Sequence, residues 1–103
     1  MAIAQQTVGT SATTIYTSTN ESAVVSVYFM NNDASAVTLQ IHVVQDGDTA
    51  ADTNKIVKDL SISAADTYVM DTEKLILSNN DTIQASASTG SVIQATVSYI
   101  GVS

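Results

Sequence analysis

Apolar and polar residues alternate with a period of two along most of this chain, and no comparable helical period appears. An alternating strand buries one row of side chains and leaves the other in water. The pattern predicts four clear strands at residues 25–29, 37–43, 82–88 and 93–99, and four shorter ones at residues 14–17, 56–62, 67–71 and 75–77.

Turn-forming residues separate these runs. The Asn- and Asp-rich segment 31–35 is predicted to be a hairpin connection between the strands on either side of it. Residues 46–47, 78–81 and 89–91 are predicted turns. The longest connection, Asp48–Lys55, is predicted to be a loop that crosses between two sheets, with one helical turn capped by Asp48.

The strand pattern predicts one all-β domain over residues 1–103. We expect a single antiparallel β-sandwich of about eight strands, with jelly-roll or Greek-key-like connections. A small closed barrel is the alternative. Residues 1–7 precede the first clear strand and are interpreted as an extended N-terminal arm, with a disordered terminus as the alternative.

Charge narrows the classes of partner. Ten acidic residues stand against three lysines and no arginine, which gives a net charge of −7. Such a chain repels phosphate, so we expect neither a nucleic-acid partner nor binding to an anionic membrane. The chain has no cysteine, and its first residues lack the features of a signal peptide, so we expect folding in the cytoplasm.

Candidate chemistry is sparse. His42 is the only histidine and lies opposite in phase to Leu39 and Ile41, so we expect it on the solvent side of its strand. The acidic residues fall mostly in turns, and no serine lies in a nucleophile elbow. These features predict a protein that is not an enzyme and needs no cofactor.

The sequence contains one candidate metal site. Asp46, Asp48 and Asp52 are closely spaced oxygen donors around Gly47, and oxygen donors are what calcium prefers. Their order differs from that of an EF-hand loop, which ends in a glutamate. They are weak calcium candidates, and the alternative is a solvated acidic loop.

The apolar run at residues 24–30 offers a candidate interface. Val24, Tyr28 and Met30 share one phase, opposite to Val27 and Phe29. Either they form an apolar surface patch, or the strand is central and buried on both faces. We therefore name Val24, Tyr28 and Met30 as interface candidates, together with Ile3 in the apolar start of the chain.

Other outward positions carry Ser, Thr and Gln rather than the charged residues that usually protect a free monomer. Uncharged polar faces can pack against a neighbour at low desolvation cost, provided that their hydrogen bonds are replaced. This composition favours a subunit of an assembly. The positions are Thr38, Gln40, Thr82, Gln84, Ser86, Gln94, Thr96 and Ser98.

The order of several segments resembles a family of small virion structural proteins of tailed bacteriophages. The resemblance covers nearly the whole chain from Val8 onward, through strand and turn patterns. The family usually has glycine in two turns where this chain has Thr19-Asn20-Glu21 and Ala64-Ala65. The matching segments are Thr14–Thr17, Met30–Asn32, Ala36–Leu39, Asp52–Ile62, Ala65–Tyr68, Leu75–Leu77, Asp81–Ala85 and Val97–Ile100.

The resemblance implies a capsid decoration or cement protein that binds the head surface and bridges neighbouring major capsid proteins. It also implies a homo-oligomer, with a trimer favoured over a dimer. The protein would be assembled in the host cytoplasm and located on the capsid surface. The alternative is a tail-, neck- or fibre-associated β-sandwich module that binds a receptor or a carbohydrate.

Overall fold

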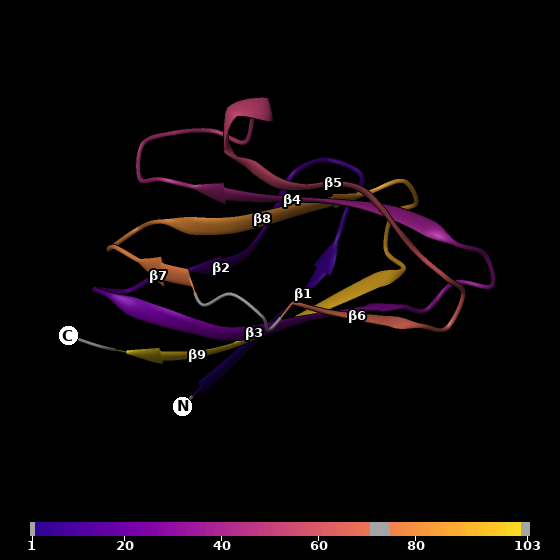
Figure 1. Ribbon diagram of the computed structural model, residues 1–103, viewed down its shortest axis with the longest axis horizontal. Helices are drawn as coiled ribbons and strands as arrows, with labels where there is room; N and C mark the ends of the chain where they lie inside the picture. The colour runs from indigo at the N-terminus through magenta and orange to yellow at the C-terminus, as the bar shows by residue number, and fades with distance from the viewer. Residues whose placement is uncertain (1, 71–74, 102–103) are drawn as a thin grey trace.

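The computed structural model describes residues 2–70 and 75–101, and nearly all regular elements within them are strands (Figure 1). Its one helical element is the short 3-10 helix η1 at Asp52–Asn54. No helix in this described part could span a membrane. The strands are β1 Ala2–Val8, β2 Thr13–Thr17, β3 Ser22–Asn31, β4 Val37–Val44, β5 Lys55–Ile62, β6 Thr67–Met70, β7 Leu75–Leu77, β8 Thr82–Ala87 and β9 Ile93–Gly101.

The strands form two antiparallel sheets that pack against each other. The five-stranded sheet has the order β1-β9-β3-β6, with β7 beside β6 along the same side of β3, and the four-stranded sheet has the order β2-β8-β4-β5. Pairing is nested along the chain: β1 pairs with β9, β2 with β8, β3 with β6 and β7, and β4 with β5. This nesting is the strand order of a jelly roll, and the predicted all-β sandwich is confirmed.

The eight predicted strands are all present, although Asp71, predicted to end one of them, lies outside the described residues. The ninth strand is β1. Residues 2–8 pair with β9 over seven positions, from Ala2 opposite Tyr99 to Val8 opposite Ile93. The segment interpreted as an arm is therefore an edge strand of the five-stranded sheet.

Two predicted connections are wrong, and they exchange roles. The segment after β3 was predicted to be a hairpin, but β3 and β4 belong to different sheets, so it crosses the sandwich. The long 45–54 loop was predicted to cross, but β4 and β5 pair in one sheet. Its helical turn is present at η1, with Ala51 rather than Asp48 as N-cap. Local turn residues do not reveal which strands pair.

Asn31 organises the crossing after β3. Its side chain is fully buried, and its Nδ2 donates to the carbonyl oxygens of Ser35 and Ile62, each at 3.0 Å. Its Oδ1 accepts from the Asp33 backbone N–H at 2.9 Å. A buried amide needs such partners, since an unpaired one costs about 1–3 kcal/mol. Asn31 thus ties the end of β3 to the end of β5 in the opposite sheet.

The core lies between the sheets and is made of the inward rows of the strands. Its largest fully buried side chains include Phe29 and Ile93 from one sheet and Leu39, Ile41 and Ile83 from the other. At the edge, the rings of Tyr16 and Tyr99 pack with centroids 4.4 Å apart. Burial of these rows supplies the main stabilisation of the fold.

A bulge in β3 changes which residues face that core. The register with β9 places Val24 opposite Tyr99 and Ser26 opposite Ser98, so Val25 is an extra residue. Side chains before the bulge face inward at even numbers, and those after it at odd numbers. Val24 is therefore buried, at 2% exposure, and its prediction as an outward interface residue is wrong.

Candidate functional site

The outward side of the five-stranded sheet is the most unusual surface of the molecule. The strand registers determine its members, because residues directly opposite each other share a face. We call this surface the apolar face. It consists of Ile3, Gln5 and Thr7 of β1, Gln94, Thr96, Ser98 and Ile100 of β9, Ala23, Ser26, Tyr28 and Met30 of β3, Thr67 and Val69 of β6, and Ile76 of β7.

The apolar face collects nearly all the exposed large hydrophobic side chains. Seven such side chains occur among the described residues, and only Ile56 of β5 lies elsewhere. A single exposed hydrophobic residue is ordinary, but a group on one face indicates a contact surface. The six on the apolar face are Ile3 at 63%, Tyr28 at 43%, Met30 at 36%, Val69 at 38%, Ile76 at 63% and Ile100 at 40% exposure.

No charged side chain occurs among the described members of this face. That is unexpected in a chain with a net charge of −7. Two large like-charged molecules repel, and placing acidic groups in a contact adds a desolvation cost. The apolar face is thus a surface on which another protein can settle without burying a carboxylate.

Several polar groups on the face already have partners within it. Thr7 Oγ1 donates to Gln94 Oε1 at 3.0 Å, and Gln5 Nε2 donates to Thr96 Oγ1 at 3.4 Å. These bonds run across the β1–β9 pair. Because paired polar groups lose fewer water contacts when covered, they lower the desolvation cost of a partner.

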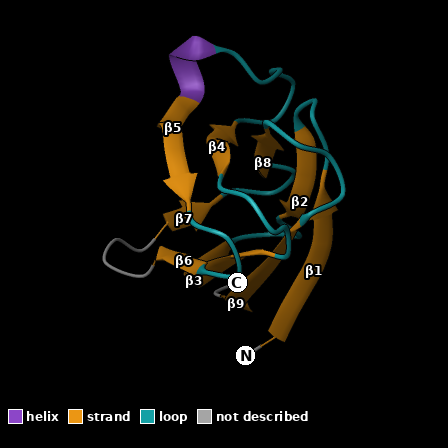
Figure 2. Cartoon of the chain, turned by 90° about the vertical axis from the view of Figure 1, so that its right-hand side faces the viewer, coloured by secondary structure: helices purple, strands orange, loops and turns teal. Residues whose placement is uncertain are grey.

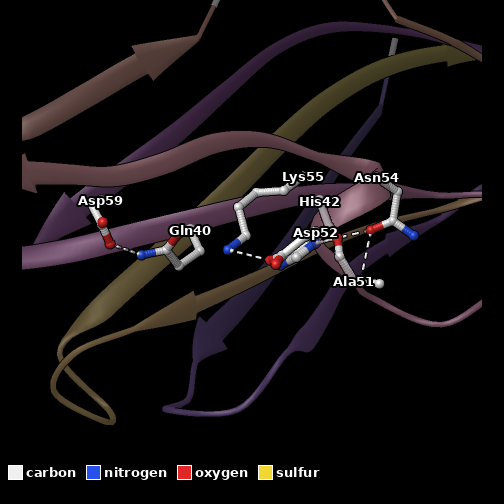
Figure 3. A network of polar contacts seen from close by, with 7 residues as sticks. All are labelled: Gln40, His42, Ala51, Asp52, Asn54, Lys55 and Asp59. Atoms are coloured by element: carbon white, nitrogen blue, oxygen red, sulfur yellow. Dashed lines mark hydrogen bonds and ion pairs between the residues drawn. The ribbon is translucent and has the colours of Figure 1, made fainter.

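The outward side of the four-stranded sheet, unlike the apolar face, is partly covered by a loop. There the 45–54 loop folds back over β4 and buries His42, which is 7% exposed (Figure 3). The phase predicted for His42 is correct, but the expectation of a solvent-exposed ring is wrong. Val44, in the same phase, is also buried and lies outside the main core.

The His42 side chain holds that loop against β4 through hydrogen bonds. Its Nδ1 lies 3.1 Å from the Ala51 carbonyl oxygen and 3.0 Å from Asn54 Oδ1. Both partners are acceptors, so Nδ1 carries the hydrogen and donates. Asn54 Oδ1 also accepts from the Ala51 N–H, and Asn54 Nδ2 donates to the Thr49 carbonyl. This arrangement gives the only histidine of the chain a structural role.

Charged groups gather at the β5 edge of the same sheet. Lys55 forms an ion pair with Asp52 at 3.2 Å, and Gln40 donates to Asp59 (Figure 3). Asp59 has a φ of +54° within the strand, at a break in register between β4 and β5. The edge is therefore charged and bulged, two features that hinder pairing with another strand.

The calcium candidates are not gathered into a site. No group of three or more His, Asp or Glu side chains is placed to hold a metal ion in the described part of the chain. The backbone N–H of Asp46 donates to Asp81 Oδ1, and the Asp52 carboxylate pairs with Lys55. Asp48 lines an open groove of about 420 Å³ together with Gln45 and Ile56. The three aspartates thus have separate surroundings.

The aromatic residues do not form an exposed cluster either. All five lie in the described part, and Tyr28 is the one whose side chain is exposed. Tyr16 and Phe29 are buried, and Tyr68 stacks on Phe29 with centroids 6.5 Å apart. A platform for sugars or single-stranded bases needs several exposed rings close together.

Three of the four predicted interface residues come together. Ile3, Tyr28 and Met30 lie on the apolar face, whereas Val24 lies in the core. Sequence reasoning missed Val69, Ile76 and Ile100. Each falls in a strand pattern, but only the pairing of β6, β7 and β9 with β3 brings them to one face.

No family model matches the sequence, and no curated protein matches it. Among solved structures, a chain in the structure of infectious bursal disease virus Gx strain is similar over 95% of this chain, with 17% identity and a TM-score of 0.40. The chain spans about a quarter of that protein, whose matched share is 27%. The tailed-phage resemblance stays a prediction.

Proposed function

We propose that this protein is a structural subunit of a tailed-phage virion, a decoration or cement protein that binds the head surface through its apolar face. The observation that carries the proposal is the composition of that face. It holds six exposed large hydrophobic side chains and no described charge in a chain of net charge −7.

The arrangement suits a physical rather than a chemical task. A flat sheet face offers a broad contact and no enclosed site, and its hydrogen-bonded Gln and Thr pairs lower the cost of covering it. A subunit that spans two neighbouring major capsid proteins would add buried area at their junction. Repeated over many copies, modest contacts sum to a large stabilisation of the shell.

The test is binding to capsids that lack this protein. Purified chain is mixed with such capsids, and the bound amount is measured by co-sedimentation over a range of concentrations. The proposal predicts saturable binding with a fixed number of copies per capsid and greater resistance of the capsids to heat. A chain that stays in the supernatant at every concentration would overturn the proposal.

A further inference from the structure

We propose that β1 is an assembly edge that pairs antiparallel with β1 of a second copy, so that two apolar faces join into one surface. The inference deepens the proposed function and rests on it, because it names how copies of the capsid-binding subunit join. The two sheets leave four strand edges open, and an open edge is a template for another strand.

Three of these edges carry features that block pairing. β5 is bulged and charged, with Lys55, Lys58 and Asp59 along it. β2 has five residues and a break in register between Thr14 and Tyr16. β6 and β7 are separate strands of four and three residues within the described part of the chain. Charges, bulges and shortness are the usual means by which natural sheets protect their edges.

β1 has none of these features. It is seven residues long, its register with β9 is continuous, and its sequence Ala-Ile-Ala-Gln-Gln-Thr-Val contains no charge and no proline. It ends the order of its sheet, and Figure 2 shows it at the outer edge of the molecule. Among the described strands, it is the one edge left open to a partner.

A second copy of β1 is the occupant that fits. The other described edges of a second copy are blunted, and two β1 strands bring no like charges together although each chain carries −7. A two-fold axis at Gln5 gives the greatest overlap. It places Gln5 opposite Gln5 of the second copy and Ile3 opposite Thr7, with the apolar faces on the same side.

The area of the joined faces supports this arrangement. Four strand positions about 4.8 Å apart and a nine-residue β9 at about 3.4 Å per residue give each apolar face a footprint of about 600 Å². Standard protein interfaces bury about 800 Å² per partner. Joining two faces doubles this footprint to about 1,200 Å². Self-pairing of β1 thus produces a platform large enough for specific binding.

The two-fold pairing makes a dimer the basic unit, in place of the trimer that the resemblance implies.

The experiment uses single cysteines, because the natural chain has none. With the axis at Gln5, Q5C places two Cβ atoms about 4.5–5.5 Å apart, and a small backbone shift brings them within the roughly 3.5–4.5 Å that a disulfide needs. T7C is the matched control, because its two sulfurs would be separated by about four residues, or about 14 Å. Mixing I3C with T7C should restore cross-linking between the two variants. Each purified variant, and the mixture of I3C with T7C, is oxidised mildly, and the cross-linked fraction is measured by non-reducing electrophoresis.

We expect Q5C to cross-link at least tenfold faster than T7C. A charge variant gives a second reading: Q5K should raise the dissociation constant of the dimer by at least about tenfold, since it places two lysines opposite each other. Gln94→Lys, on the same face but on the central strand β9, should leave the dimer intact. Circular dichroism confirms that each variant is folded.

Two outcomes would overturn the inference: equal cross-linking of Q5C and T7C, or a natural chain that sediments as a monomer at high concentration. Binding to capsids is a separate reading. A dimer that does not bind capsids would contradict the proposed function and leave the β1 pairing intact. A monomer that binds capsids would contradict the β1 pairing and leave the proposed function intact.

Discussion

The two sheets of this sandwich have similar inner faces and different outer faces. The outer face of the five-stranded sheet is apolar, uncharged in its described part and uncovered, whereas the 45–54 loop, fastened by His42, covers part of the other. The charged β5 edge belongs to the covered side. Since the inner faces satisfy the needs of folding, the contrast lies outside the core, and the apolar face is the surface through which the proposed capsid contact would form.

The largest expected effect comes from placing charges on the apolar face. The double variant Y28K/M30K should weaken capsid binding by about 100- to 1,000-fold, because truncating or charging a central interface residue costs about 2 kcal/mol or more. Both side chains are exposed, so the free energy of unfolding should change by less than about 1 kcal/mol. Co-sedimentation and urea unfolding measure the two quantities.

The matched control puts the same charges on the other sheet. Thr14 and Ser61 are exposed on its outward side, opposite Gln84 and Thr38. T14K/S61K should bind capsids as the natural chain does. If both double variants lose binding equally, the loss comes from charge rather than from the face.

The next effect concerns the cover of the four-stranded sheet. H42F keeps a ring but removes the Nδ1 donor to Ala51 and Asn54, so it should lower the free energy of unfolding by about 1–2 kcal/mol. H42N, which keeps a donor near the same position, should lose less. Capsid binding should be unchanged in both. A stability equal to that of the natural chain would show that the loop is held by other contacts.

Salt separates an uncharged contact from an ion-paired one. Two chains of net charge −7 repel, and raising the salt screens that repulsion without weakening an uncharged contact. The dissociation constant of the β1-paired dimer should therefore fall a few-fold between about 0.05 and 0.5 M sodium chloride. Sedimentation velocity provides the measurement, and a dimer that dissociates as salt rises would indicate ion pairs.

The smallest effect tests the backbone next to β6. Ala65 has a φ of +61°, a conformation that glycine adopts without strain, and it lies in a turn where the resembled family usually has glycine. A65G should stabilise the fold by about 0.5 kcal/mol, since relief of backbone strain outweighs the larger conformational entropy that a glycine loses on folding. A64G, at a residue without positive φ, should destabilise it. Thermal unfolding of the pair gives the sign of each change.

Local sequence was enough to predict most of the strands and not enough to predict their partners. Alternation identified eight strands, because burying one face imposes a period of two. It missed β1, because the positions in phase with the core are Ala4, Gln6 and Val8, and Gln6 is polar and exposed. It also misplaced Val24, because a one-residue bulge reverses the phase and leaves no clear local mark.

The candidate site depends still more on tertiary structure. Tyr28 and Met30 could be predicted from their phase in one strand, but Val69, Ile76 and Ile100 join them only through the pairing of distant strands. His42 shows the opposite case. Its phase was predictable, but its burial was not, because the covering loop returns from residues 45–54.

Hydroxyl-radical footprinting on capsids tests the central claim most directly, because it reports the solvent exposure of individual side chains. Tyr28 and Met30 lie on the apolar face, and Ile56 on β5 is an exposed reference at 47%. Binding to capsids that lack the protein should suppress oxidation of Tyr28 and Met30 and leave Ile56 as reactive as in the unbound chain. Protection of Ile56 with undiminished oxidation of Tyr28 and Met30 would contradict the account.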